Sequence, residues 1–429
     1  VTGHIHTHIY TYIYMLTKSI KFRERKLIVY IIGCVFTAIA VVFLLYYGSS
    51  VTPLEDPQAT IASLTRAFAA DSELEPQSAV FVSWPELKAF PGESSYPQYT
   101  PLLDVIKSWN PDVAEPPERF VETLQHFNYS DPYERKLAEE YRNAEVPFKL
   151  YDVPNIDQVR LKWNKQYLAG AMRYETPHVE KSTNNHFMYW TKKRKSGRDY
   201  KPPTDLIKMT FAEWSEEAER ADRLKLNNES VHYYYMLGSR PGDRSKSFIA
   251  KDLPIFSTRD PNFFIPNPRA NKGTQCRFGM RGVIAEAHYD SGRNMVAMIR
   301  GRKRYILTPP KTCKYLGIIS DMKHPSFRHS IIDWSDIQQA TAHRFDQVDS
   351  IDTIVRTGEV LYIPSFWFHY IISLEYSIQC NSRSGFPDDM KGAEYIERSD
   401  CIDSVLGDTQ ARRRKRKNES DKMSLKQER

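Results

Sequence analysis

Two stretches of this 429-residue chain carry the strongest structural signal: HYDSGRNMVAMIRGRKRYILTPP (288–310) and GEVLYIPSFWFHYIISLEYSIQCNSRSG (358–385). Both consist of β-branched and aromatic residues interrupted by glycine, proline and aspartate, a pattern typical of short strands joined by turns. Similar segments lie upstream: VHYYYML (231–237), TQCRFGM (274–280) and GVIAEAHYD (282–290). Such a succession of short strands predicts an antiparallel sandwich or a jelly roll.

Two of these segments carry a candidate metal centre. His288 and Asp290 lie two residues apart on one predicted strand, so their side chains project to the same face. A second predicted strand ends at a proline turn, and this turn carries His369. Two imidazoles and one carboxylate favour non-haem Fe(II) and leave coordination positions open for a co-substrate and O₂. We therefore predict that these three residues bind the metal and form the catalytic centre, although a histidine and an aspartate on one strand are more often a surface pair.

Lys303 is a candidate anion-binding residue. It begins a strand that continues through Tyr305 and Leu307 on one face, and an ammonium among apolar neighbours needs a fixed anion. A dicarboxylate co-substrate would supply that anion in a charge-assisted hydrogen bond. The alternative is that Lys303 joins the neighbouring arginines on a solvated hairpin tip.

Together these stretches resemble the JmjC-domain, cupin-like oxygenases, in particular their asparaginyl hydroxylases. The resemblance extends over residues 79–385 and is strongest in the last third. It implies a mainly β fold with flanking helices, around a double-stranded β-helix (jelly-roll) core. It also implies an Fe(II)- and 2-oxoglutarate-dependent dioxygenase that uses O₂ and releases succinate and CO₂ while it hydroxylates its substrate.

Several site residues follow from the resemblance by position. His288, Asp290 and His369 match the iron ligands. Lys303 matches the lysine that pairs with the distal carboxylate of 2-oxoglutarate. Two further matches are asparagines that line the co-substrate and iron site: Asn294 and Asn381.

A tyrosine on an earlier strand also faces the distal carboxylate in this family. Tyr233, Tyr234 and Tyr235 compete for that role, and strand alternation would place Tyr233 and Tyr235 on one face. The chain departs from the family pattern at Ala285, where the asparaginyl hydroxylase has a threonine that touches the carboxylate. One hydrogen bond, typically worth about 0.5–1.5 kcal/mol, is therefore missing, but the lysine contact remains.

Residues 27–47, LIVYIIGCVFTAIAVVFLLYY, contain no charge and are numerous enough to cross a bilayer as one helix of about 30 Å. Basic residues of the segment 18–26 precede this run, whereas Glu55 and Asp56 follow it. The positive-inside rule then places the catalytic domain in the lumen of the endoplasmic reticulum or Golgi. We expect a single-pass type II membrane protein, in which one transmembrane helix precedes the jelly roll. A cleaved signal peptide would have a shorter apolar core.

Composition divides the rest of the chain. The first methionine is Met15, so we interpret residues 1–14 as an upstream extension that is not translated, although their alternating histidines could bind metal. The predicted parts are a cytosolic segment (1–26), the anchor (27–47), a stem (48–77), an N-terminal α/β part of the catalytic domain (78–230), the jelly-roll core (231–400) and a basic, disordered tail (401–429).

Helices are expected in the α/β part. The segments 132–143 and 156–168 have helical patterns, and VPFKLY (146–151) between them is typical of a strand. Thr210 and Glu213 form a capping box that begins a further helix through about Ala221.

The net charge of +7 does not by itself indicate nucleic-acid binding, because much of the excess lies in the segments 18–26 and 412–417. Five cysteines without C-x-x-C spacing argue against a zinc ribbon and permit disulfides without requiring them. With a lumenal domain, the expected substrate is a protein side chain of the secretory pathway. The alternatives are a non-catalytic cupin-like binding protein, a sugar-binding or storage cupin, and, without a real membrane segment, a JmjC demethylase or RNA hydroxylase.

Overall fold

A computed structural model describes the greater part of the chain between residues 81 and 385. The described residues are 81–83, 89–91, 96–173, 178–191, 200–224, 233–237, 247–271, 273–321 and 323–385. The chain divides into two compact units, 1–78 and 79–429, and all described residues belong to the second. The predicted segments 1–26, 27–47 and 48–77 and the tail 401–429 lie outside the described residues.

The prediction of a transmembrane helix must be corrected. Among the residues that the structure describes, no helix is both long and apolar enough to cross a bilayer. A run of apolar residues is only the compositional condition for a span, which also requires one continuous helix of about 20 residues. The fold class is therefore a mainly β, cupin-like fold with helices. The assignment as a single-pass type II membrane protein with a lumenal domain depended on that helix and is withdrawn with it.

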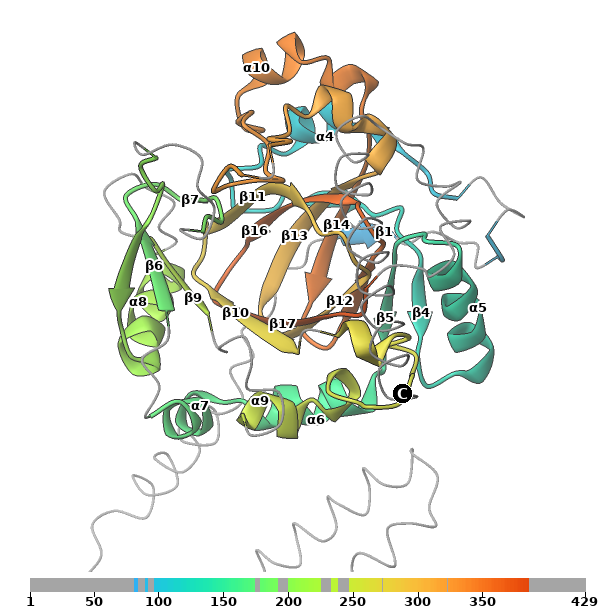
Figure 1. The fold of residues 1–429 in the computed structure, drawn as a ribbon, viewed down its shortest axis with the longest axis vertical. Helices are drawn as coiled ribbons and strands as arrows, with labels where there is room; N and C mark the ends of the chain where they lie inside the picture. Colours follow the sequence, from blue (N-terminus) through green and yellow to red (C-terminus); the bar gives the residue numbers. More distant parts are fainter. Residues whose placement is uncertain are drawn as a thin grey trace, which may run out of the picture. The chain divides into compact units, whose positions relative to one another are not determined.

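The core is a jelly roll of eight strands in two facing sheets (Figure 1). One sheet has the core order β15-β12-β17-β10, and the other has the order β14-β13-β16-β11. Most consecutive strands lie in opposite sheets, which is the connectivity of a double-stranded β-helix. The strands are β10 (Thr274–Gly279), β11 (Ile284–Tyr289), β12 (Asn294–Arg300), β13 (Arg302–Thr308), β14 (Asp349–Arg356), β15 (Val360–Ile363), β16 (Phe368–Ser373) and β17 (Ser377–Arg383).

Further strands extend both sheets. The larger sheet has nine strands because β4 (His126–Asn128), β5 (Phe148–Tyr151), β9 (Tyr233–Leu237), β6 (His178–Ser182) and β8 (Asp205–Lys208) join its ends. The smaller sheet has six, with β2 (Thr100–Pro101) and β7 (His186–Phe187) at its edges. A separate parallel pair consists of β1 (Phe81–Ser83) and β3 (Arg119–Val121).

Alternation along the strands separates the barrel interior from the helix-covered outer faces. Inward side chains such as Val296, Tyr305 and Ile371 pack between the sheets. Outward side chains of the larger sheet pack against helices α5 to α9, and those of the smaller sheet against α4 and α10. The helices are α4 (Leu102–Ser108), α5 (Pro132–Asn143), α6 (Pro154–Lys162), α7 (Lys165–Ala171), α8 (Phe211–Arg223), α9 (Phe248–Asp252) and α10 (Ile337–Ala342), with short 3-10 turns at Pro254–Phe256, Pro268–Ala270, Pro310–Tyr315 and Phe345–Gln347.

The local helix signals were informative. The helix predicted at 132–143 is α5. The capping box of α8 is also confirmed: the Glu213 amide donates to the Thr210 hydroxyl, and the Thr210 amide donates to the Glu213 carboxylate. The helix expected over 156–168 is instead two helices, because the Asn164 side chain accepts a hydrogen bond from the Tyr167 amide and begins α7 there.

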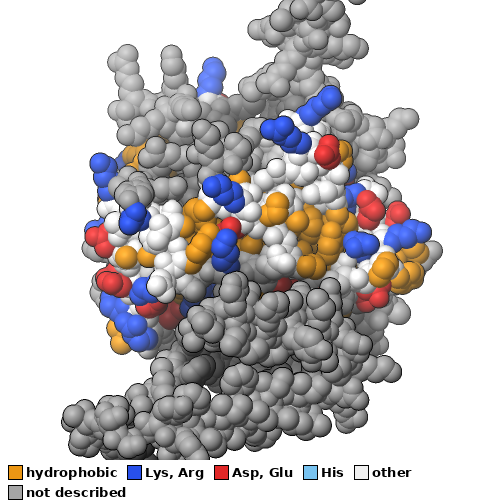
Figure 2. Space-filling view, turned by 90° about the horizontal axis from the view of Figure 1, so that it is seen from below, with side chains coloured by type: hydrophobic (Ala, Val, Ile, Leu, Met, Phe, Trp, Pro, Cys, Tyr) orange, Lys and Arg blue, Asp and Glu red, His pale blue; other side chains and the backbone are white. Residues whose placement is uncertain are grey.

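The face below the larger sheet is shown in Figure 2. Among the described residues visible there, lysine and arginine side chains are scattered between apolar and uncharged ones, not gathered into a continuous basic patch. Among the described residues, Leu161 of α6 is 74% exposed, next in sequence to the charged Lys162. Single exposed apolar side chains of this kind are ordinary on protein surfaces.

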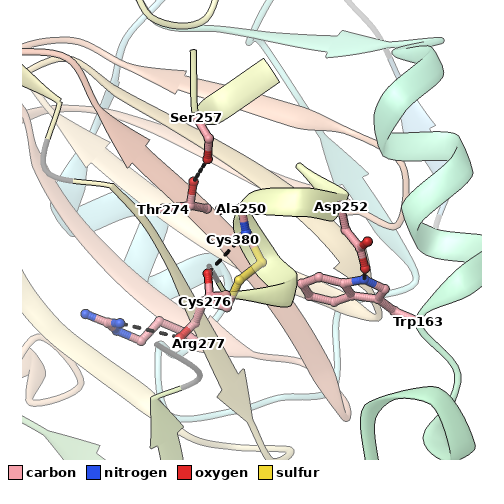
Figure 3. The surroundings of a disulfide bond; sticks show 9 residues. Trp163, Ala250, Asp252, Ser257, Thr274, Cys276, Arg277 and Cys380 are labelled. Atoms are coloured by element: carbon pink, nitrogen blue, oxygen red, sulfur yellow. Dashed lines mark hydrogen bonds between the residues drawn. A yellow bond between two sulfur atoms is a disulfide. The ribbon is translucent and has the colours of Figure 1, made fainter. Parts of the chain in front are cut away.

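One disulfide joins two neighbouring strands of the larger sheet. Cys276 of β10 and Cys380 of β17 are partners in the antiparallel register and are joined through their sulfurs (Figure 3). Both lie on the outer, helix-covered face of the sheet, in the same apolar cluster as Trp163.

A buried charge network joins the two sheets beside the barrel. The Lys149 ammonium on β5 lies 2.8 Å from Glu122 and 3.1 Å from Glu359, and it donates to the Ile354 carbonyl on β14 at 2.8 Å. The Lys149 and Glu122 side chains are fully buried. Burial raises the pKa of Glu122 to about 7, against the opposing effect of Lys149. Breaking such a network leaves charge without compensation in a poorly solvated place.

We predict that Lys149→Met lowers the free energy of unfolding by roughly 3–5 kcal/mol, because Glu122 and Glu359 lose their shared counterion. Urea unfolding followed by circular dichroism measures the change. The matched control is Lys136→Met on the exposed face of α5, for which a change within about 0.5 kcal/mol is expected. Equal stability of the two variants would show that the network contributes nothing.

Candidate metal centre

The structure brings His288, Asp290 and His369 together at one end of the barrel. Their potential ligand atoms all lie within 4.8 Å of one another. His288 of β11 and His369 of β16 are partners in the antiparallel register, with ring centroids 4.3 Å apart. The Asp290 carboxylate lies 4.0 Å from Nε2 of His369. Contrary to our expectation, His369 lies within a strand of its own and not on the turn that precedes it.

Both imidazoles are oriented by main-chain carbonyls. Nδ1 of His288 lies 2.7 Å from the Glu286 carbonyl, and Nδ1 of His369 lies 3.1 Å from the Trp367 carbonyl. A carbonyl can only accept, so each Nδ1 carries the proton and each Nε2 presents its lone pair. Burial lowers the pKa of both rings, and for His288 the neighbouring His369 and His329 lower it further. Neutral imidazoles of this tautomer are suited to bind a metal ion.

Two arginines hold the Asp290 carboxylate. Arg383 of β17 lies 2.6 Å from Oδ2, and Arg328, from the connection between β13 and β14, lies 2.9 Å from Oδ1. Burial alone would raise the pKa of Asp290, but Arg383 and Arg328 outweigh it and keep the pKa well below its ordinary value. Asp290 is therefore ionised throughout the neutral range, as a metal ligand must be.

Arg328 and its neighbour His329 were not predicted. Arg328 has a φ of 79°, which is unfavourable for a residue with a side chain, and it also donates to the Tyr289 carbonyl at 2.8 Å. His329 is buried, and its ring stacks on His288 at a centroid distance of 4.9 Å. Their segment carries no strand or helix pattern, so the sequence offered no signal that it approaches the centre.

A cavity of about 390 Å³ extends from the centre into the barrel. Its wall combines the three candidate ligands with side chains from both sheets and from the approaching connection. The other lining residues are Glu180, Phe187, Tyr189, Tyr235, Gln275, Arg277, Ala285, Asn294, Val296, Tyr305, Arg328, His329, Ile363, Ile371, Gln379, Asn381 and Arg383.

Most residues expected to contact the co-substrate lie at this cavity. The Asn381 amide donates to Asn294 at 3.0 Å, and both line the wall beside Asp290. Of the three competing tyrosines, Tyr235 lines the cavity, whereas Tyr233 and Tyr234 are not among the described lining residues.

Lys303 lies immediately behind the cavity wall. Its ammonium is 5.4 Å from the centroid of the Tyr235 ring, and it is almost fully buried. Burial, followed by the charge of Arg277, lowers the pKa of Lys303 to about 7. Among the described residues no carboxylate forms an ion pair with it. The hairpin-tip alternative is therefore excluded, since Lys303 is inside the barrel.

Fold and centre together define a cupin-like protein with a two-histidine, one-carboxylate site. A family model for the cupin-like domain matches residues 134–382. This chain belongs to that family, in its JmjC-related branch.

Curated relatives match shorter parts of the chain. The "tRNA wybutosine-synthesizing protein 5" of Danio rerio is 25% identical over 181 residues, which are 40% of this chain and 52% of the relative. The "Lysine-specific demethylase 8" of Xenopus tropicalis is 33% identical over 101 residues, 23% of this chain and 22% of the relative. The "JmjC domain-containing protein D" of Dictyostelium discoideum is 31% identical over 111 residues, 26% of this chain and 25% of the relative. The chain spans about half the length of the first relatives it matches.

The donor set fits a divalent transition metal. Two Nε2 atoms and one carboxylate oxygen can occupy three neighbouring positions around one ion, the arrangement preferred by non-haem Fe(II). The cavity beside them leaves the other positions accessible.

We predict that His288→Ala and Asp290→Asn each weaken Mn(II) binding by more than about 100-fold, because even residues that only orient a ligand contribute 10–100-fold. Isothermal titration calorimetry on metal-free protein measures this. His343→Ala, which removes an exposed histidine at the end of α10, should bind Mn(II) like the native chain. Unchanged binding by the first two variants would exclude these residues as ligands.

Proposed function

We propose that the protein is an Fe(II)- and 2-oxoglutarate-dependent dioxygenase that hydroxylates a protein side chain. The observation that carries the proposal is the convergence of His288, Asp290 and His369 at a cavity behind whose wall the buried ammonium of Lys303 lies. A non-catalytic or sugar-binding cupin has no need of this donor set together with an inward lysine.

The chain's own residues would bind and orient the reactants. Lys303, whose ammonium lies 5.4 Å from the centroid of the Tyr235 ring, would attract the distal carboxylate of 2-oxoglutarate together with that tyrosine, and the hydrogen-bonded pair of Asn294 and Asn381 would lie beside its metal-binding end. Iron, when bound to the three ligands, would supply the activation of O₂ by which 2-oxoglutarate becomes succinate and CO₂. The apolar part of the cavity wall, which includes Phe187, Val296 and Ile371, would hold the C–H bond of the substrate next to the centre.

The cavity favours a single inserted side chain as the substrate group. A volume of about 390 Å³ accommodates the co-substrate with one further small group. Glu180 contributes a buried carboxylate to the wall, where it accepts a hydrogen bond from Thr204 at 2.9 Å. A carboxylate there can accept a hydrogen bond from an amide or an ammonium, the donors that protein side chains offer. This supports a protein side chain as the substrate group.

RNA is the second candidate substrate, since one relative is named as a tRNA wybutosine-synthesizing protein. The argument from a lumenal location no longer excludes it. Comparing cells with and without the protein distinguishes the two: protein hydroxylation adds 16 Da to peptides, whereas RNA modification changes the nucleosides of digested RNA.

We predict that the purified protein with Fe(II), 2-oxoglutarate and O₂ produces succinate even without its substrate, through slow uncoupled turnover. His369→Ala should reduce the rate to that of free iron, because two ligands cannot keep the metal in place. Succinate is measured by mass spectrometry, with His343→Ala as the active control. Succinate formation by His369→Ala at the native rate would contradict the proposal.

We further predict that 2-oxoglutarate binds more weakly as the pH rises above about 7. The pKa of Lys303 is lowered to about 7 in the empty cavity, and a bound carboxylate would raise it, so the complex holds a proton that the free protein has lost. The affinity of the Mn(II)-loaded protein should fall by up to about tenfold per pH unit above that value, with proton uptake. Calorimetry in two buffers of different ionisation enthalpy measures both. In Lys303→Met, binding should be weaker and without this dependence; an equal slope in that variant would assign the proton to another group.

A further inference from the structure

Arg277 is a cation that faces the cavity and that the proposed function does not yet use. It lies on β10 and lines the cavity wall, whereas the adjacent Cys276 lies on the opposite face of the strand. In Figure 3 the Arg277 side chain leaves the strand away from the disulfide, which faces Ala250 and Trp163.

The charge of Arg277 has no counterion among the residues that the structure describes. Its guanidinium donates to the Gln275 side chain at 3.2 Å and to the Cys276 carbonyl at 3.5 Å, and both acceptors are neutral. Glu180 is near enough to be influenced electrostatically, but no ion pair forms between the two, and its carboxylate accepts from Thr204 instead. A half-buried guanidinium held only by neutral acceptors has capacity for an anionic ligand.

The register of β10 fixes how deep Arg277 lies. Gln275 is paired with Asn381, at the level of the metal centre, and Arg277 is paired with Gln379, one inward position deeper. Gly279 is one position deeper again, and a Cβ placed there would lie 3.2 Å from the Lys303 ammonium. Arg277 therefore lies between the metal centre and Lys303 along the same face.

The length of the co-substrate matches the level of Arg277. Two residues along a strand advance about 6.6 Å. The carbon chain of 2-oxoglutarate has four C–C bonds of about 1.5 Å and extends roughly 5 Å from one carboxylate to the other. Bound to the metal at one end, it reaches one level into the barrel, where Arg277 projects from the larger sheet. Lys303 lies one level deeper, behind the ring of Tyr235.

We propose that Arg277 is a second cationic contact for the distal carboxylate, which it holds from the larger sheet while Lys303 attracts it from the smaller one. The inference rests on the proposed function and assigns the residue that selects a dicarboxylate over a monocarboxylate 2-oxoacid. It also accounts for Ala285: the hydroxyl that this position lacks is replaced by a guanidinium from the facing sheet.

The test is calorimetric titration of Mn(II)-loaded protein without O₂, so that no turnover is needed. The ligands are 2-oxoglutarate and 2-oxopentanoate, in which a methyl group replaces the distal carboxylate. Arg277→Met should weaken 2-oxoglutarate binding by about 10- to 100-fold and leave 2-oxopentanoate binding unchanged. Arg277→Lys should recover part of the loss, because it restores the charge without the planar fork.

The control variant is Arg300→Met, which removes an exposed arginine of β12 that stacks on Tyr376. It should bind both ligands like the native protein. Thermal unfolding of the ligand-free variants verifies that each one folds. If Arg277→Met binds 2-oxoglutarate like the native protein while Lys303→Met binds it weakly, Arg277 has no such role and the proposed function stands. If the native protein itself does not bind 2-oxoglutarate in the presence of metal, the proposed function and this inference fail together.

Discussion

The pairing of β11 with β16 is the constraint on which the candidate centre depends. His288 is opposite His369 in this antiparallel ladder, and Ala285 is opposite Ile371. Three steps along β11 therefore correspond to two along β16, which requires one extra residue, a β-bulge, between Ala285 and His288. The bulge allows Ala285 and His288 to face the same cavity despite their odd spacing. Bulges commonly redirect side chains next to functional sites in this way.

The bulge also determines what lies on the outer face. The Glu286 side chain pairs with His186 of β7, while the Glu286 main-chain carbonyl accepts a hydrogen bond from Nδ1 of His288. Asp112 contacts the same histidine at 3.1 Å. Burial would lower the pKa of His186, but Asp112 and Glu286 raise it to about 10. A charged cluster on the outer face thus supports the backbone that orients a ligand on the inner face.

The sequence predicts those parts of the fold and of the candidate site that depend on residues close together along the chain. Strand alternation and turn residues sufficed to predict a jelly roll, because both signals are local. The spacing of His288 and Asp290 indicated only two of the three residues that the structure brings together; His369 was added from the second strand with its proline turn and from the family resemblance. The position of Arg383 at the cavity could have been predicted, because it lies two residues after Asn381 on a predicted strand and therefore on the same face. The sequence could not predict the bulge in β11 or the approach of Arg328 to Asp290, because neither feature produces a periodic pattern of residues. The prediction of a transmembrane helix was wrong for the opposite reason. The local composition of residues 27–47 was taken to determine the membrane topology of the whole chain.

The connection between β13 and β14 carries α10 and two short 3-10 turns, and its described residues contribute no strand to either of the two sheets. It nevertheless delivers a guanidinium to Asp290 and a ring to the face of His288. The residue that makes the first contact, Arg328, adopts a backbone conformation that few side chains tolerate. In protein engineering or in evolution, trimming this connection would therefore alter the coordination chemistry of the centre, even though none of the ligands themselves had been replaced.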